Sequence, residues 1–209
     1  MLRFALLRRA HPPATSKAAL ARGRIGFGGA RRNPAMARRY PMHYRAIVHD
    51  VKAGGTSVLQ PGESVPDVAF RDRDGSSFSL ASLRGKPFVL YFYPKDDTPG
   101  CTAEACAFRD AYQDFTDAGA EVIGVSSDDA VTHERFASKH RLPFRLLTDE
   151  RGAGQKAFGV SKTLGILPGR VTFVVDAAGV VRHAFDSQFM ATKHISEALH
   201  ALKGLSNPA

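Results

Sequence analysis

The two cysteines of the chain, Cys101 and Cys106, lie five positions apart in a segment that favours thiol chemistry. An apolar run at Phe88–Tyr93 predicts a buried strand, and a loop with Pro and Gly separates this strand from a predicted helix that begins at Cys101. A thiol at a helix N-terminus faces unsatisfied backbone N–H groups and the positive end of the helix dipole. Both stabilise the thiolate, which is the nucleophilic form, so we expect Cys101 to be reactive.

The spacing of the two cysteines limits what they can do together. In an intact helix, residues i and i+5 lie about 140° apart around the axis, with a Cα–Cα distance of about 8.6 Å. A disulfide needs Cα atoms within about 7 Å of each other. If Cys101 and Cys106 ever form a disulfide, the first turns of the helix must therefore unwind.

Other uses of paired thiols fit the sequence less well. A zinc site needs two further ligands, and none of the eight histidines has a suitable spacing, so we expect no metal and no other cofactor. The Cys-x-x-Cys pattern of thioredoxin-type reductases is absent, and two cysteines are too few for a secreted disulfide scaffold. The close spacing of the two thiols indicates redox chemistry.

The net charge of +9 comes from one end of the chain. Residues 1–49 contain ten Arg and one Lys but no Asp or Glu, which leaves 18 basic and 20 acidic residues for positions 50–209. The body therefore lacks the charge pattern of a nucleic-acid-binding protein. Hydrophobic residues make up 44% of the chain, but no stretch approaches the roughly 20 apolar residues that span a bilayer. We expect neither a nucleic-acid nor a membrane partner.

The basic segment predicts a division of the chain into an extension, residues 1–56, and one folded domain, residues 57–206. Several prolines and glycines interrupt the extension, which has no steady hydrophobic periodicity, so we expect it to be disordered. An Arg-rich, acid-free N-terminus is typical of an organelle transit peptide, although this one contains a single Ser. The alternative is a start assigned too early, with Met36 or Met42 as the true start. We expect a cytoplasmic protein, or an organelle protein if the extension is a transit peptide.

Strand and helix signals alternate through the body. The predicted strands are 65–70 paired with 76–80 in a hairpin, then 88–93, 121–126 and 144–147, and finally 170–175 paired with 180–185. The predicted helices are 101–118, 128–140, 154–158 and 192–203, with a helical turn at 80–85. This order predicts an α/β protein with a central mixed sheet, helices on both faces and three layers.

The pattern Pro94-x-x-x-Thr98-x-x-Cys101 resembles the active-site signature of the peroxiredoxins. The longer string 93–110 is similar to the bacterioferritin-comigratory-protein/peroxiredoxin Q subgroup, as are shorter segments at 61–67, 122–126, 136–144, 167–173 and 188–189. The resemblance covers about residues 58–204. It implies a thioredoxin-like three-layer sandwich with an N-terminal β-hairpin.

The resemblance also implies a role for each of five residues. Cys101 matches the peroxidatic cysteine, and Thr98 matches the threonine whose hydroxyl bonds both the thiolate and the peroxide. Pro94 matches the proline that shields the pocket from water. Arg170 matches the arginine that lowers the pKa of the thiol and orients the peroxide. Cys106 matches the resolving cysteine of the atypical two-cysteine type.

By this resemblance the chain is expected to be a thiol peroxidase that uses thioredoxin, or a similar dithiol, to reduce hydrogen peroxide and alkyl hydroperoxides. The peroxide converts the peroxidatic thiol to a sulfenic acid, which then condenses into an intramolecular disulfide. Because that disulfide needs no second subunit, we expect a monomer. The alternative is a redox-sensing or chaperone-like thiol protein with little turnover. Three acidic residues near Cys101 in this motif, Asp96, Asp97 and Glu104, are expected to be solvated.

Overall fold

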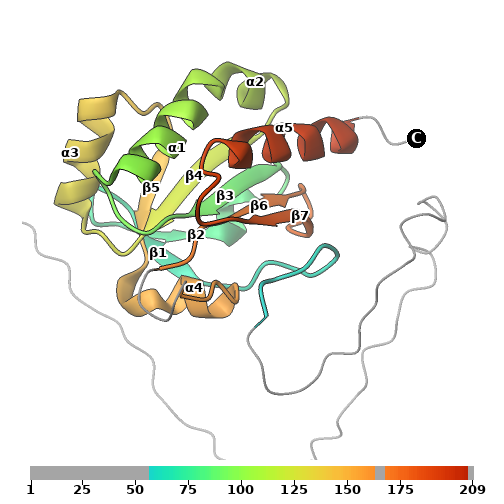
Figure 1. Ribbon diagram of the computed structural model, residues 1–209. Coiled ribbons are helices and arrows are strands. Elements are labelled where there is room, and N and C mark those ends of the chain that lie inside the picture. Colours follow the sequence, from blue (N-terminus) through green and yellow to red (C-terminus); the bar gives the residue numbers. More distant parts are fainter. Residues whose placement is uncertain (1–56, 163–167, 207–209) are drawn as a thin grey trace, which may run out of the picture. The chain divides into compact units, whose positions relative to one another are not determined.

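The structure is a computed structural model that describes residues 57–162 and 168–206. The predicted basic extension, residues 1–56, lies outside the described residues. Seven strands form one sheet in the order β2-β1-β5-β4-β3-β6-β7 (Figure 1). They are β1 (Ala69–Arg71), β2 (Ser77–Ser79), β3 (Phe88–Phe92), β4 (Glu121–Ser126), β5 (Arg145–Thr148), β6 (Val171–Val175) and β7 (Val181–Asp186).

The sheet is mixed, and its central strands are its most apolar ones. β3 pairs in parallel with β4, and β4 pairs in parallel with β5, whereas β6 runs antiparallel to β3. All five residues of β3 and of β6 are buried. Continuous apolar runs are typical of strands that are covered on both faces, and a cover on both faces requires a layer of chain above and below the sheet.

Helices cover the two faces unequally. Figure 1 shows α1, α2, α3 and α5 on one side of the sheet and α4 on the other. The helical segments are η3 (Leu80–Leu83), α1 (Pro99–Asp110), α2 (Tyr112–Asp117), α3 (Ala130–His140), η4 (Glu150–Gly152), α4 (Ala153–Ala157) and α5 (Lys193–Ser206). The predicted three-layer α/β sandwich with helices on both faces is therefore confirmed, with most of the helical mass on one face.

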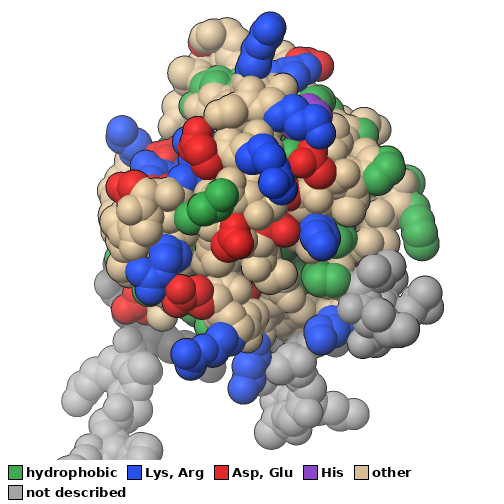
Figure 2. Space-filling view, turned by 90° about the vertical axis from the view of Figure 1, so that its left-hand side faces the viewer, with side chains coloured by type: hydrophobic (Ala, Val, Ile, Leu, Met, Phe, Trp, Pro, Cys, Tyr) green, Lys and Arg blue, Asp and Glu red, His purple; other side chains and the backbone are tan. Residues whose placement is uncertain are grey.

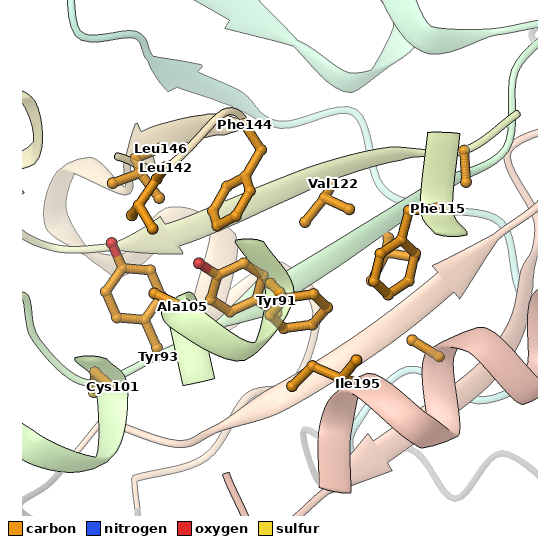
Figure 3. Packing of buried hydrophobic residues seen from close by; sticks show 14 of the residues in the cluster. Tyr91, Tyr93, Cys101, Ala105, Phe115, Val122, Leu142, Phe144, Leu146 and Ile195 are labelled. Carbon is orange, nitrogen blue, oxygen red and sulfur yellow. The ribbon is translucent and has the colours of Figure 1, made fainter. Parts of the chain in front are cut away.

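Each face of the sheet has its own apolar cluster. On the helix-rich face, Tyr91 of β3 packs with Phe108 of α1, Phe115 of α2 and Ile195 of α5 (Figure 3). On the opposite face the cluster contains, among others, Phe70, Leu80, Phe92, Phe158 and Phe173. Alternation along β3 produces this division, because successive side chains of a strand point to opposite faces.

The surface of the described residues carries charges of both signs. Figure 2, which views the molecule from the side on which α3 lies in Figure 1, shows Lys and Arg side chains interspersed with Asp and Glu side chains. Within residues 57–162 and 168–206, no helix is both long enough and apolar enough to cross a membrane.

The predicted strands and helices occur in the predicted order, but two differ in extent: the strand predicted over 65–70 is formed only at Ala69–Arg71, and the first long helix is divided. A single helix over 101–118 is wrong: α1 begins two residues earlier, at Pro99, and ends at Asp110, and α2 follows after Ala111. Proline is well tolerated in the first helical turn, where its missing N–H would have no intrahelical acceptor. The break at Ala111 has a backbone ψ of 7° and contains neither Gly nor Pro, so no residue type marks it in the sequence.

Candidate active site

Cys101 lies in the first turn of α1, at the end of the sheet where the chain leaves β3. Its side chain is buried in the cluster of the helix-rich face, with a residue exposure of 1% (Figure 3). The N–H groups of a first helical turn have no intrahelical acceptors, and they carry the positive end of the helix dipole. The sulfur therefore occupies a site that is shielded from water and favourable to negative charge.

Arg170 is the charged group that contacts this sulfur. β6 pairs with β3 antiparallel up to the pair Phe92 and Val171, so Arg170, one residue earlier, lies beside the chain that leaves β3. Its Nη2 donates to Sγ of Cys101 at 3.2 Å, and its Nε donates to the carbonyl oxygen of Gln188 at 3.3 Å. The side chain of Arg170 is itself buried, with 4% exposure, so its attraction for an anion is little screened by solvent.

Glu104 completes the pairing of the guanidinium, although it was expected to be solvated. It lies one turn after Cys101 on the same helical face, is fully buried, and accepts a hydrogen bond from Nη1 of Arg170. Burial raises the pKa of this carboxyl to about 8, against the opposing effect of Arg170. The expectation of a solvated Glu104 is wrong because position i+3 from a buried residue also faces the core.

A buried histidine that the sequence argument did not assign lies next to this pair. Nδ1 of His194, on α5, is 3.7 Å from Oε1 of Glu104, and its Nε2 lies 2.9 Å from the carbonyl oxygen of Ser187. A carbonyl only accepts, so Nε2 carries the proton, and Nδ1 accepts from the hydroxyl of Thr172 at 2.8 Å. Burial lowers the pKa of His194 to about 4, so its ring is neutral at neutral pH.

Asp96, which was also expected to be solvated, anchors the loop that leads to Cys101. Its carboxylate accepts from the hydroxyl of Tyr93 at 2.7 Å and lies 2.7 Å from Nδ1 of His133 in α3. Its backbone N–H donates to Asp128 at 2.8 Å. These buried bonds tie the loop to α3 and to the end of β4. Asp96 is buried because its two oxygens have partners inside the protein. By contrast, Asp97 is exposed, as expected.

Thr98 and Pro94 lie on the same loop. Thr98 is the N-cap residue of α1, and its carbonyl oxygen accepts from the N–H of Thr102. Its hydroxyl donates to the carbonyl oxygen of Lys95 at 3.0 Å, so the hydroxyl hydrogen is engaged there rather than at the sulfur of Cys101. The hydroxyl oxygen keeps lone pairs that can accept a hydrogen bond. Pro94 lies two residues after the end of β3 and is half-buried.

Cys106 is half-buried, and both cysteines are free thiols. α1 is continuous through both positions, so the predicted need for unwinding before they can form a disulfide applies to this helix. Sγ of Cys106 lies 3.9 Å from Nδ1 of His140, at the end of α3. Among residues 57–162 and 168–206, no group of three or more His, Cys, Asp or Glu side chains is arranged to hold a metal ion.

A shielded thiol that is held between a guanidinium and a helix N-terminus can act as a nucleophile on an oxygen–oxygen bond, because both groups stabilise negative charge at the reacting atoms. The fold and this site together define a thiol-dependent redox enzyme built on a thioredoxin-like α/β sandwich.

Comparisons with known proteins identify the family. A model described as "AhpC/TSA family" matches residues 61–184. The chloroplastic peroxiredoxin Q of Triticum aestivum is 52% identical over 148 residues, which cover 70% of this chain and 68% of that protein. A structure of Xanthomonas campestris peroxiredoxin Q is 33% identical, with a TM-score of 0.64, and the match covers 73% of this chain and 99% of that one. Mycobacterium tuberculosis peroxidoxin BcpB is 36% identical, with a TM-score of 0.65, over 70% of this chain and 98% of that one.

The chain therefore belongs to the AhpC/TSA family, and within it to the peroxiredoxin Q group. It is a thiol peroxidase, as the signature around Cys101 predicted, and its two cysteines are consistent with the atypical two-cysteine mechanism. Membership implies peroxide substrates and a thioredoxin-type reductant.

Proposed function

We propose that the protein reduces hydrogen peroxide and alkyl hydroperoxides through Cys101, with thioredoxin as the electron donor and Cys106 as the resolving thiol. The observation that carries this proposal is the 3.2 Å contact between Nη2 of Arg170 and Sγ of Cys101 in a buried first helical turn. Support for alkyl substrates comes from a 32% identical structure of the Xanthomonas campestris bacterioferritin comigratory protein, whose description refers to alkyl peroxide reduction activity.

In the first step the thiolate of Cys101 attacks the terminal oxygen of the peroxide, and the oxygen–oxygen bond breaks. Sulfur gains a hydroxyl group and becomes a sulfenic acid, while water or an alcohol leaves after it takes up a proton. Negative charge develops on the leaving oxygen. Arg170 and the N–H groups of the first turn of α1 are the donors available to stabilise that charge. Thr98 can orient the peroxide through its free lone pairs, and Pro94 limits the access of water.

In the second step Cys106 attacks the sulfenic acid. The first turn of α1 must open, and it is held weakly: the Thr98 side chain makes no capping hydrogen bond, and Pro99 and Gly100 are exposed. Gly also has a low helix propensity. The disulfide closes a small loop, which favours exchange with an external dithiol such as thioredoxin. No second subunit is needed, so we propose a monomer, which light scattering after gel filtration can test.

The proposal is tested by peroxide consumption with a thioredoxin system. Cys101→Ser should abolish turnover. Cys106→Ser should stop turnover with thioredoxin but still consume one equivalent of peroxide per chain, because Cys101 is oxidised once. A rate constant with hydrogen peroxide no greater than that of a free thiolate would contradict the peroxidase proposal and support the redox-sensing alternative.

We propose an organelle location, with the plastid as the first candidate. Support comes from relatives at about 50% identity, whose names carry the term chloroplastic, and from the Arg-rich, acid-free composition of residues 1–49. These observations favour the transit-peptide alternative over the cytoplasm. Residues 1–56 fused to a fluorescent protein should direct it to the organelle, and diffuse cytoplasmic fluorescence would contradict this proposal.

A further inference from the structure

Cys106, His140 and Asp97 form a chain of contacts on the surface where α1 meets α3. Nδ1 of His140 lies 3.9 Å from Sγ of Cys106, and Nε2 of the same ring lies 3.4 Å from Oδ1 of Asp97. The three residues come from different parts of the sequence: the middle of α1, the last residue of α3, and the loop between β3 and α1. The site around Cys101 uses none of these three side chains.

The two contacts of the ring fix where the proton of a neutral His140 resides. A carboxylate only accepts hydrogen bonds, so the nitrogen that faces Asp97 carries the proton. Nδ1 therefore presents its lone pair to the thiol of Cys106. The ring also packs edge-on against Phe136, with ring centroids 4.9 Å apart, which restricts its rotation. This is the arrangement of a base that is oriented by an acid and aimed at a thiol.

Charged groups of both signs surround the ring and the thiol. Arg109, one turn along α1, interacts electrostatically with Cys106, and its Nη1 donates to the carbonyl oxygen of His140 at 2.8 Å. Asp110 pairs with the guanidinium of Arg109 at 2.8 Å. Lys139 pairs with Asp97 at 2.7 Å and offsets part of the carboxylate charge that faces the imidazole.

We propose that His140 is the general base of the resolving step, oriented by Asp97, and that Arg109 stabilises the Cys106 thiolate that His140 creates. This inference rests on the proposed role of Cys106 as the resolving thiol. The peroxidase chemistry at Cys101 does not require it.

The thiol of Cys106 gives its proton to Nδ1 of His140. The Cys106 thiolate then attacks the sulfenic sulfur of Cys101, the sulfur–sulfur bond forms, and the sulfur–oxygen bond breaks. Hydroxide leaves and takes up the proton held by the imidazolium, directly or through solvent, to give water. The sulfur of Cys106 is oxidised and the sulfur of Cys101 is reduced, so no further oxidant or reductant is needed.

The geometry also accounts for which end of the helix moves. Cys106 lies on the second turn of α1, where Arg109 links the helix to the end of α3. The first turn lacks a side-chain capping hydrogen bond from Thr98, and two of its residues, Pro99 and Gly100, are exposed. Unwinding of the first turn brings the sulfenic acid toward Cys106, while Cys106 stays beside His140.

The test is a quenched-flow measurement on the full chain. Reduced protein is mixed with one equivalent of hydrogen peroxide, quenched with a sulfenic-acid trap and an alkylating agent, and analysed by mass. Two rates are followed: the formation of the sulfenic acid and its conversion to the disulfide. We expect His140→Gln to slow the conversion by about 10-fold or more at pH 7, with sulfenic acid formation unchanged. The deficit should shrink at high pH, where solvent deprotonates the thiol. Asp97→Asn should slow the conversion of the sulfenic acid to the disulfide by a smaller factor, with the same pH dependence.

Two controls separate a catalytic role from a structural one. His200→Gln, at an exposed position of α5, should leave both rates unchanged. In His140→Ala, added imidazole should restore part of the conversion rate, which a purely structural role would not allow. Equal conversion rates in His140→Gln and the unmodified protein at every pH would overturn the proposal. If peptide mapping shows no disulfide between Cys101 and Cys106 in the unmodified protein, it is the proposed role of Cys106 that fails.

Discussion

Arg170 and Cys101 are 69 positions apart, yet Nη2 of the arginine donates to Sγ of the cysteine at 3.2 Å. The antiparallel pairing of β3 and β6 creates this contact, because it brings the start of β6 to the end of β3, where the chain turns into α1. The sheet thus fixes the position of the cation, and the helix fixes the position of the thiol.

Replacing Arg170 with lysine should show that the shape of the guanidinium matters as well as its charge. Arg170 contacts Cys101, Glu104 and the carbonyl of Gln188 at once, and a single ammonium group cannot span these three partners. We expect Arg170→Lys to lower the rate constant with hydrogen peroxide by roughly 100-fold. Stopped-flow kinetics measures this rate, with Arg135→Lys at an exposed position as the matched control. If the rate constant of Arg170→Lys fell by less than about 3-fold, the requirement for a guanidinium with several donors at this position would be contradicted.

Glu104 should make the folded state less stable as the pH rises toward 8. In the unfolded chain its carboxyl loses its proton near 4.5, whereas the folded protein keeps that proton up to about 8. The folded state therefore binds more protons between these values, and raising the pH favours unfolding. The expected loss is about 2 kcal/mol between pH 6.5 and 8, and it should be absent in Glu104→Gln. Urea unfolding in a Cys101→Ser background, where the thiol cannot titrate, measures the difference. If the free energy of unfolding changed equally with pH in Glu104→Gln and in its parent, the assigned role of Glu104 would be contradicted.

His194 should make the folded state less stable as the pH falls below 6.5, whereas Glu104 makes it less stable as the pH rises. Its pKa is lowered to about 4 in the folded state, from 6.5 in the unfolded chain, so the unfolded state binds more protons between these values. Acidification from pH 6.5 to 4.5 therefore favours unfolding through His194 and opposes it through Glu104. Removing the histidine removes its destabilising contribution and leaves those of the other groups, Glu104 among them, in place.

In His194→Gln, stability relative to the unmodified protein should increase on acidification over this range. Unfolding midpoints at pH 4.5, 5.5 and 6.5 report the trend, and His200→Gln is the control. If the unfolding midpoints of His194→Gln and the unmodified protein differed by the same amount at all three pH values, the lowered pKa of His194 would be contradicted.

Gly124 on β4 makes room for the buried ring of Tyr91. A Cβ atom at this position would lie 2.7 Å from the tyrosine hydroxyl oxygen and 2.8 Å from Cδ2 of Leu146. Gly124→Ala should lower the free energy of unfolding by about 1–3 kcal/mol through overpacking. Gly204 in α5 has open space around it, so Gly204→Ala should raise stability by up to about 1 kcal/mol through helix propensity. Urea denaturation of both variants tests the contrast.

Much of the fold could be predicted from the sequence because the signals were local. The apolar run of β3 and the Asp-Gly turn between β1 and β2 mark their elements directly. Gly75 in that turn adopts a φ of 81°, which glycine accepts without strain. The break between α1 and α2 could not be predicted, because Ala111 is a good helix former and only tertiary packing decides its conformation.

The candidate site was predicted where one motif held the residues together, and missed where distant segments meet. Cys101, Thr98 and Pro94 share one short stretch, and a resemblance pointed to Arg170. The burial of Asp96 depends on His133, 37 positions away, and the place of His194 depends on how α5 packs. Glu104 is different, because its spacing of three from Cys101 was a usable sign that it shares the buried face.

The uneven distribution of helices over the sheet has a consequence for the catalytic cycle. α1 lies on one face, while the opposite face has a separate apolar cluster around Phe92 and Phe173. When the first turn of α1 opens, the strands that support Arg170 keep the whole of that second cluster. Because no residue of that cluster belongs to α1, re-forming the turn that we propose to open needs no repacking on the opposite face of the sheet.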